Sequence, residues 1–270
     1  MKPSEASGYL WRSAQRSHVG KVRQVNEDSV LARPDLGIWA VADGLGGHQC
    51  GDKASHMVVD ALAQITPTLE LDGVLAIARD KLTEVNDSLT QDSADQPGST
   101  PGSTVASLIV QGTSCAVLWA GDSRAYLLRD GKLRRLSRDH SQAEELVQSG
   151  LLDRRDVVGH PASSVLTRAV GARGGLELED VRLDIFPGDY FLLCSDGLYN
   201  EVSEPELERV LSENDCESAA EALLQLALSG EARDNISIVA IQVELEQDTA
   251  DCCETAVNPV FFSRPDTGES

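Results

Sequence analysis

The sequence predicts an α+β domain in which antiparallel β-strands are covered by helices. Apolar runs of strand length recur along the chain, stop at turn residues, and often follow one another with no helix between them. Other stretches place their apolar residues on one face of a helix, as a helix packed on a sheet does. Strands that follow one another without crossover helices favour antiparallel sheets over a doubly wound parallel sheet.

Five apolar runs and one hairpin define the expected strands. The runs are GIWAVA at 37–42, STVASLIV at 103–110, SCAVLWA at 114–120, DYFLLCS at 189–195 and NISIVAIQVEL at 235–245. Several runs stop at pairs such as Asp43-Gly44 and Asp196-Gly197, which we expect to be turns. The hairpin covers 124–137, where Asp130-Gly131 between two short β-like runs predicts a type I′ turn.

Helical periodicity appears in three segments, at 51–65, 71–89 and 219–228. In the first segment the apolar residues recur at helical spacing, namely at Ala54, Met57, Val58, Ala61, Leu62 and Ile65. A further helix is expected to begin at Ser203, because Ser203 and Glu206 have the spacing of a capping box.

Composition narrows the class of function. The 270 residues contain 23 Lys and Arg against 44 Asp and Glu, a formal net charge of −21. Such a charge repels phosphate backbones and anionic membranes, so we expect neither a nucleic-acid-binding nor a membrane-bound protein. No leader pattern and no apolar run of membrane-spanning length are present, so we expect a cytoplasmic protein. The six cysteines lack disulfide-framework or zinc-site spacing and are expected to be reduced thiols.

Two segments and the C-terminus look irregular. Residues 91–102 are a polar loop with Pro and Gly, and residues 141–165 combine a short amphipathic helix pattern with the basic stretch Asp153-Arg154-Arg155-Asp156. The chain becomes polar and loses its periodicity from about residue 246, which predicts a loosely held tail.

Carboxylates occur at the ends of the expected strands along the whole chain. They are Glu27, Asp28, Asp43, Asp122, Asp196 and Asp234. Hard divalent cations such as Mg²⁺ and Mn²⁺ take oxygen ligands, and a few carboxylates from separate strands can bind two such ions. A pair of ions that shares a carboxylate and a water can activate that water for displacement at phosphorus. The arrangement is typical of a phosphoester hydrolase.

Eight short motifs then occur in one order from Ser17 to Val243. They are RQVNED at 23–28, VADGLGGH at 41–48, GST at 102–104, AGDSR at 120–124, DHS at 139–141, LTRAVG at 166–171, CSDGL at 194–198 and RDNIS at 233–237. In order and spacing the chain resembles the metal-dependent serine/threonine protein phosphatases of the protein phosphatase 2C (PP2C, PPM) type, in their compact bacterial form. The resemblance implies a central antiparallel β-sandwich flanked by helices on both sides, a four-layer αββα arrangement.

The resemblance also implies a role for each of these acids. Asp43 would bridge two Mn²⁺ or Mg²⁺ ions, and Gly44 would offer its carbonyl to one of them. The remaining acids of the centre would ligate the second ion or hold its waters, namely Asp196, Asp234, Glu27 and Asp28. Arg23 would bind the substrate phosphate, for which its forked donors suit better than a lysine. Asp122 would help to bind a weaker third ion.

Four further features qualify these roles. Asn200 stands where many animal relatives carry another acid, which implies weak binding of the third ion. His48 and His140 could titrate near neutral pH, but the favoured interpretation is that they are hydrogen-bonded structural groups, so neither is placed in the catalytic set. Residues 141–165, with Arg154 and Arg155, match the family's flap beside the active site.

The expected activity is hydrolysis of phosphoserine or phosphothreonine by direct attack of a metal-bridging hydroxide, without a phosphoenzyme. Two alternatives stay open: a pseudophosphatase or docking module that binds a phosphoprotein or kinase without turnover, and a phosphohydrolase of small molecules. The resemblance implies a phosphoprotein substrate and a cognate Ser/Thr kinase. It also implies a link to kinases that control protein secretion. We expect a monomer with an N-terminal extension at 1–15, a phosphatase domain at 16–246 and a polar tail at 247–270.

Overall fold

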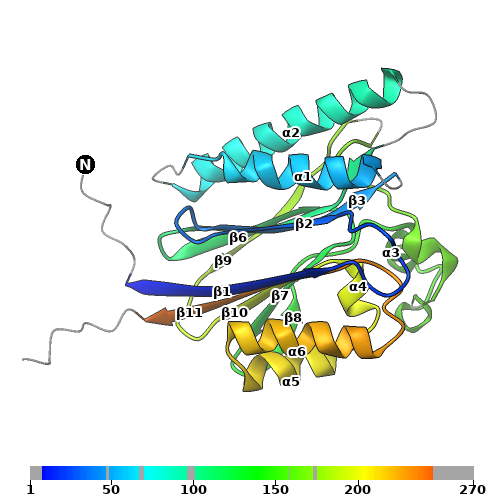
Figure 1. Cartoon of the computed structure of the whole chain (residues 1–270). Coiled ribbons are helices and arrows are strands. Elements are labelled where there is room, and N and C mark those ends of the chain that lie inside the picture. Colours follow the sequence, from blue (N-terminus) through cyan, green and yellow to red (C-terminus); the bar gives the residue numbers. More distant parts are fainter. Residues whose placement is uncertain are drawn as a thin grey trace, which may run out of the picture.

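The computed structural model is a sandwich of two antiparallel β-sheets with helices on both outer faces (Figure 1). The structure describes residues 8–46, 49–66, 70–95, 101–157, 159–172 and 175–245. The predicted α+β class and the four-layer arrangement of helix, sheet, sheet and helix are confirmed.

One sheet has five strands in the order β1-β11-β10-β7-β8. The other sheet has the order β2-β3-β5-β6-β9, with the short β4 paired to β3. The strand bounds are Tyr9–His18 for β1, Asp28–Arg33 for β2, Ile38–Leu45 for β3, Gly102–Ser103 for β4, Val105–Gln111 for β5, Ser114–Ala120 for β6, Arg124–Arg129 for β7, Lys132–Arg135 for β8, Glu179–Asp184 for β9, Tyr190–Cys194 for β10 and Ile236–Leu245 for β11.

Helices α1 and α2 cover the six-stranded sheet, and α5 and α6 cover the five-stranded sheet (Figure 1). The helix bounds are Gln49–Ala63 for α1, Leu71–Asp95 for α2, Gln142–Gln148 for α3, Asp196–Tyr199 for α4, Glu204–Glu213 for α5 and Cys216–Ser229 for α6, with 3₁₀ turns at Arg154–Asp156 and Pro161–Ser164. The helices and sheets bury three apolar layers, because each sheet is apolar on both faces. Trp39 and Phe191 lie in the layer between the two sheets.

Local sequence signals account for several elements. Asp130 and Gly131 both have positive φ, 53° and 71°, as a type I′ turn requires, so the predicted hairpin of β7 and β8 is confirmed. The capping box of Ser203 and Glu206 at the start of α5 is also confirmed. The helical segments at 51–65, 71–89 and 219–228 correspond to α1, α2 and α6.

Three strands, β1, β2 and β9, were not among the expected elements, and each lies at an edge of its sheet. Strand β1 pairs with β11 along its full length, from Tyr9 opposite Leu245 to His18 opposite Ile236. The predicted domain boundary after residue 15 is therefore wrong, because residues 9–15 are part of the sandwich. Edge strands keep polar side chains on their solvent face, so β1 has no continuous apolar run to reveal it. Residues 1–7 and the predicted tail at 247–270 lie outside the described residues.

Two predicted turns and one loop need correction. Asp43-Gly44 is not a turn, because β3 runs through both residues to Leu45. Asp196-Gly197 is the first turn of helix α4, and its Asp side chain belongs to the helix start. The loop expected at 91–102 is shorter than predicted, because α2 extends to Asp95 and β4 begins at Gly102. Tertiary pairing thus overrides the local preference of Asp-Gly for turns.

The cysteine prediction agrees with the described part of the chain. Cys115, Cys194 and Cys216 are buried with free thiols, and no disulfide joins the cysteines of the described residues. Cys252 and Cys253 lie outside those residues. Among the described helices, none has both the length and the apolar character needed to cross a membrane.

Candidate active site

The acids of the site lie where the ends of the two sheets meet. Strands β2 and β3 place Asp28 directly opposite Asp43 in the antiparallel ladder. In the other sheet, Asp196 follows β10 and Asp234 precedes β11, and these two strands are also neighbours. Each carboxylate therefore starts from a strand end or strand pair whose position is fixed by a sheet.

A cavity of about 260 Å³ opens among these strand ends. Its walls include seven of the residues that the sequence predicted at the site, namely Arg23, Glu27, Asp43, Gly44, Asp122, Asp196 and Asp234. The structure therefore brings together residues that are up to 211 positions apart in the sequence, as in the Arg23–Asp234 pair. Asp28 does not line the cavity. It is 5% exposed and lies opposite Asp43 on the neighbouring strand.

The side chain of Asn235 holds the connection between β1 and β2 against β11. Its Nδ2 donates to the carbonyls of Val19 and Val25, both at 3.0 Å. Its Oδ1 accepts from the backbone N–H of Glu27 at 2.8 Å. Asn235 therefore places Glu27 beside the cavity. The sequence contained Asn235 within a quoted motif, but nothing in the pattern assigned it this task.

Thr104 connects β3 to the bend that carries Asp122. Its Oγ1 accepts from the backbone N–H of Asp43 at 3.0 Å, and its own N–H donates to the Asp43 carbonyl at 2.9 Å. The same Oγ1 shares a hydrogen bond of 2.7 Å with the hydroxyl of Ser123. Asp43 and Asp122 are thus positioned by one buried threonine, and nothing in the sequence pattern predicts this role.

Burial and mutual repulsion raise the pKa values of four carboxylates at the site, namely Asp28, Asp43, Asp122 and Asp196. Burial raises the pKa of Asp28 to about 6, although the Ser195 hydroxyl donates to its Oδ2 at 2.7 Å and opposes the shift. Burial, followed by the negative charge of Asp139, raises the pKa of Asp122 to about 7. The pKa values of Asp43 and Asp196 also lie well above the ordinary range, because both are buried and surrounded by other acids. A cation in the cavity would remove this repulsion.

The donor set fits a hard divalent cation. Three buried carboxylate oxygens have no hydrogen-bond partner among the described residues, namely Glu27 Oε1, Asp28 Oδ1 and Asp196 Oδ1. Leaving a charged oxygen buried and unpaired is costly unless it faces a cation. Within the described residues, no three His, Cys, Asp or Glu side chains are close enough together to hold an ion by themselves. Mg²⁺ and Mn²⁺ do not require such a group, because these ions retain several waters and use few protein ligands.

A family comparison agrees with this site. The family model described as protein phosphatase 2C matches residues 14–229, most of the chain. The chain belongs to the protein phosphatase 2C family.

Individual phosphatases of this family support the same assignment over nearly their whole length. The serine/threonine phosphatase stp of Listeria monocytogenes is 34% identical over 247 residues, which cover 87% of this chain and 97% of that protein. The solved structure of PppA of Pseudomonas aeruginosa superposes with a TM-score of 0.81 at 42% identity, over 86% of this chain and 97% of that one. The catalytic domain of the phosphatase PstP, solved with two manganese ions, has a TM-score of 0.77 at 32% identity and covers 87% of this chain and 99% of its own.

This protein phosphatase 2C is therefore a metal-dependent serine/threonine protein phosphatase that uses Mn²⁺ or Mg²⁺. The predicted activity and cofactors are confirmed at this level. The alternative of a docking module without turnover has no support from the comparisons.

Of the other residues singled out in the sequence, Arg23 and Asn200 lie at the site and His140 does not. Arg23 donates from Nη2 to Asp234 Oδ2 at 2.8 Å and keeps half of its side chain exposed at the cavity mouth. Asn200 donates to Asp196 Oδ2 at 3.3 Å, on the side of the cavity toward Asp122. His140 is buried away from the cavity, accepts from the Gly121 N–H at 3.2 Å and stacks on Trp119, as the structural interpretation expected. His48 lies outside the described residues.

The raised pKa of Asp122 predicts how the metal-free phosphatase responds to pH. An ordinary Asp in the unfolded chain titrates near 3.8, whereas Asp122 in the fold titrates at about 7. Ionisation of Asp122 therefore lowers the free energy of unfolding. This loss of stability is absent below pH 3.8, the pKa in the unfolded chain, and is complete above about pH 7, the pKa in the fold. In EDTA, we expect Asp122→Asn to raise the melting temperature at pH 8 by about 2–4 °C, the shift for roughly 1 kcal/mol in a domain of this size. The difference should shrink steadily toward pH 4.

Thermal unfolding of both proteins across this pH range tests the expectation. If the difference in melting temperature between the two proteins did not change with pH, ionised Asp122 would not destabilise the fold. Exposed Asp60 on α1 supplies the matched control, since Asp60→Asn should leave the pH dependence of the wild type unchanged.

Proposed function

We propose that Asp43 bridges the two metal ions and that Asp196 and Asp234 complete the second ion's ligand shell with Glu27. The Gly44 carbonyl would face one ion, and Asp28 would hold coordinated water from behind. The observation that carries this proposal is the set of unpartnered, buried oxygens of Glu27, Asp28 and Asp196. When bound, Mn²⁺ or Mg²⁺ supplies a lowered water pKa and positive charge for the phosphate oxygens.

We assign phosphate binding to Arg23. Its guanidinium is held at the mouth of the cavity by Asp234, and the carboxylate raises its pKa further above the usual value. The fork of Arg presents parallel donors to two phosphate oxygens, which orients the ester for in-line attack. The half-exposed side chain keeps donors available for a substrate.

Asp122 is proposed as the ligand of a weaker third ion. It lines the catalytic cavity and also the adjoining space beside Asn200. An amide at position 200 contributes no negative charge, so this ion would be bound less tightly than the two core ions.

We further propose that the enzyme reverses a bacterial Ser/Thr kinase that controls a secretion system. The support comes from one relative, since PppA is described as a key regulatory component of the type VI secretion system of Pseudomonas aeruginosa. The free buried thiols favour a reducing compartment, and we place the enzyme in the cytoplasm. We propose a monomer, because one copy supplies every group assigned at the site.

Phosphate release from a phosphothreonine peptide is the direct test of this function. We expect turnover with Mn²⁺ or Mg²⁺ and none in EDTA, with recovery when metal is restored. Equal release in EDTA would overturn the metal requirement. If the folded protein were inactive with both metals, the result would favour a docking module that binds a phosphoprotein without turnover.

Arg23→Ala tests the phosphate-binding role. We expect KM for the peptide to rise about tenfold or more, with a smaller change in kcat, because the lost interaction is already made with the bound ester. Arg23→Lys should recover only part of the loss, since a lysine offers a point charge without the fork. An unchanged KM in Arg23→Ala would remove Arg23 from the phosphate site.

A further inference from the structure

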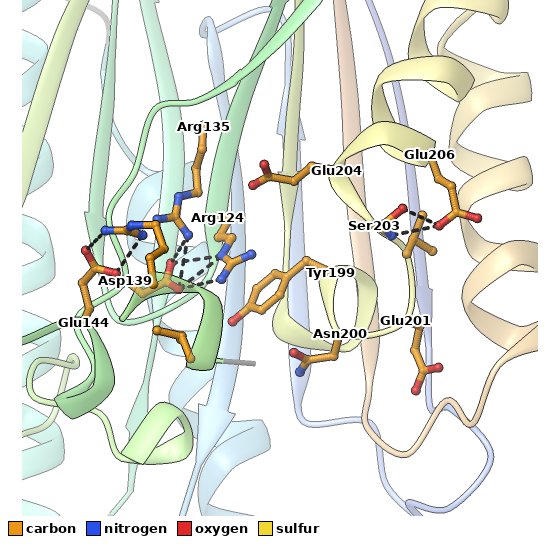
Figure 2. Close-up of a pocket in the computed structure, with 13 residues that line it drawn as sticks. Arg124, Arg135, Asp139, Glu144, Tyr199, Asn200, Glu201, Ser203, Glu204 and Glu206 are labelled. Atoms are coloured by element: carbon orange, nitrogen blue, oxygen red, sulfur yellow. Dashed lines mark hydrogen bonds and ion pairs between the residues drawn. The ribbon is translucent and has the colours of Figure 1, made fainter. Parts of the chain in front are cut away.

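A second and larger cavity has a volume of about 700 Å³, and Figure 2 shows the residues that line it. We call it the flap cavity. It is enclosed by the β7–β8 hairpin with Arg124 and Arg135, by flap residues such as Arg154, and by the connection from α4 to α5 at residues 199–206.

The flap cavity adjoins the catalytic site through residues that line neighbouring cavities. A small intermediate cavity of about 160 Å³ shares Asp122, Ser164 and Asp196 with the catalytic cavity. The same intermediate cavity shares Arg124, Tyr199 and Asn200 with the flap cavity. A peptide whose phosphorylated residue occupies the metal centre can therefore place a neighbouring side chain in the flap cavity.

On one wall of the flap cavity, three arginines pair with two carboxylates. Asp139 accepts from Arg124 Nη2 at 2.7 Å and from Arg124 Nε at 3.0 Å, and it lies 3.4 Å from Arg135 Nη1. Glu144 pairs with Arg154 at 2.7 Å. The Arg124 guanidinium also stacks on the ring of Tyr199, 3.5 Å from the ring centroid. These arginines are committed to partners within the protein.

The opposite wall is acidic, and its carboxylates form no ion pair with a cation among the described residues. Glu201 accepts from the N–H groups of Glu231 and Ala232, and Glu206 accepts from Ser203 in the capping box. The carboxylate of Glu204 makes no hydrogen bond or ion pair with another described residue. Figure 2 shows it pointing from the start of α5 into the space between the walls. Three arginines and five carboxylates line the cavity, so it is negative overall.

We propose that the flap cavity binds a basic side chain, Arg or Lys, close in sequence to the phosphorylated residue of the substrate, with Glu204 as its ion-pair partner. The inference rests on the phosphatase activity. A cationic residue there gains a carboxylate that has no other partner, whereas an acidic residue meets the negative wall. The net charge of −21 favours the approach of basic segments as well.

A set of phosphothreonine peptides tests this proposal. One Arg is placed in turn at each position on either side of the phosphothreonine, and each peptide is compared with its Ala and Glu counterparts by kcat/KM. For wild type, we expect at least one position at which Arg is about threefold to fivefold better than Ala, the size expected of a partly exposed ion pair. In Glu204→Gln the ratio of the Arg peptide to the Ala peptide should fall toward one.

The ratio of two peptides cancels any general effect of a substitution on the metal centre. Glu204→Lys should transfer the preference to the Glu peptide at the same position. Glu213→Gln, at the far end of the same helix, is the matched control and should keep the wild-type ratio. Equal rates for Arg and Ala at every position, or an Arg preference that survives in Glu204→Gln, would overturn the proposal. If wild type preferred the Glu peptide, the proposal would also be wrong, and the arginines of the flap cavity would instead bind an acidic side chain of the substrate. Failure to hydrolyse any peptide, or p-nitrophenyl phosphate, would instead contradict the phosphatase function.

Discussion

Asp43→Asn is expected to lower kcat/KM by about a thousandfold or more while leaving the fold intact. The substitution keeps the shape of the side chain and the backbone bond from Asp43 N–H to Thr104 Oγ1. It removes the charge that would bridge the two ions, and metal stabilisation of the transition state is worth several kcal/mol. Phosphate release from a phosphothreonine peptide at saturating Mn²⁺ provides the measurement.

The same protein should melt at a higher temperature than wild type in EDTA, since Asp43 is buried among other acids and its pKa is strongly raised. Loss of activity together with gain of metal-free stability separates a ligand from a structural residue. Asp60→Asn, on the exposed face of α1, should match wild type in both measurements. If Asp43→Asn kept wild-type turnover, Asp43 could not be the carboxylate that the two metal ions share.

Gly44→Ala is expected to lower the melting temperature by roughly 5–10 °C and to weaken Mn²⁺ binding at least tenfold. A Cβ at Gly44 would lie 2.2 Å from the Gly51 carbonyl oxygen and 2.5 Å from the Glu27 carbonyl oxygen. Both obstacles are backbone atoms, which cannot rotate away as a flexible side chain can. The start of α1 or the segment that carries Glu27 must therefore move.

Calorimetric titration with Mn²⁺ and thermal unfolding in EDTA separate the two effects of this substitution. Gly8→Ala is the matched control, because a Cβ at Gly8 meets no atom within 4 Å. Wild-type affinity and stability in Gly44→Ala would show that α1 can withdraw from β3 at no cost. The requirement for glycine here comes from close packing rather than from a positive φ.

Much of the fold could be predicted from sequence because its inner strands are apolar runs. Strands β3, β5, β6, β10 and β11 are buried on both faces and read as continuous hydrophobic segments. Edge strand β1 escaped detection because charged residues interrupt it, and its partner β11 lies more than 200 residues away. Local periodicity does not contain information on such a partner.

The acids that line the cavity could be predicted in kind, although their geometry could not. Strand-end carboxylates indicated a divalent-metal site, and the resemblance carried by the ordered motifs proposed Asp43, Asp196 and Asp234 as its ligands. The supports of these acids were not predicted. Asn235 and Thr104 act through hydrogen bonds to backbone groups of Glu27 and Asp43, which lie far away in sequence. From the sequence alone, a polar motif residue that binds a metal cannot be distinguished from one that hydrogen-bonds to a backbone segment.

The sequence by itself determined the α+β class, the chemical class of the metal site and the family, because apolar runs, carboxylates and ordered motifs are local properties of the chain. Tertiary structure alone decided that Asp43-Gly44 continues a strand, that Gly44 must lack a side chain, and that Glu204 faces a cavity near the catalytic site. Each of these depends on which distant backbone comes within a few ångströms. That proximity is set by packing of the two sheets and their helices, which no single segment encodes.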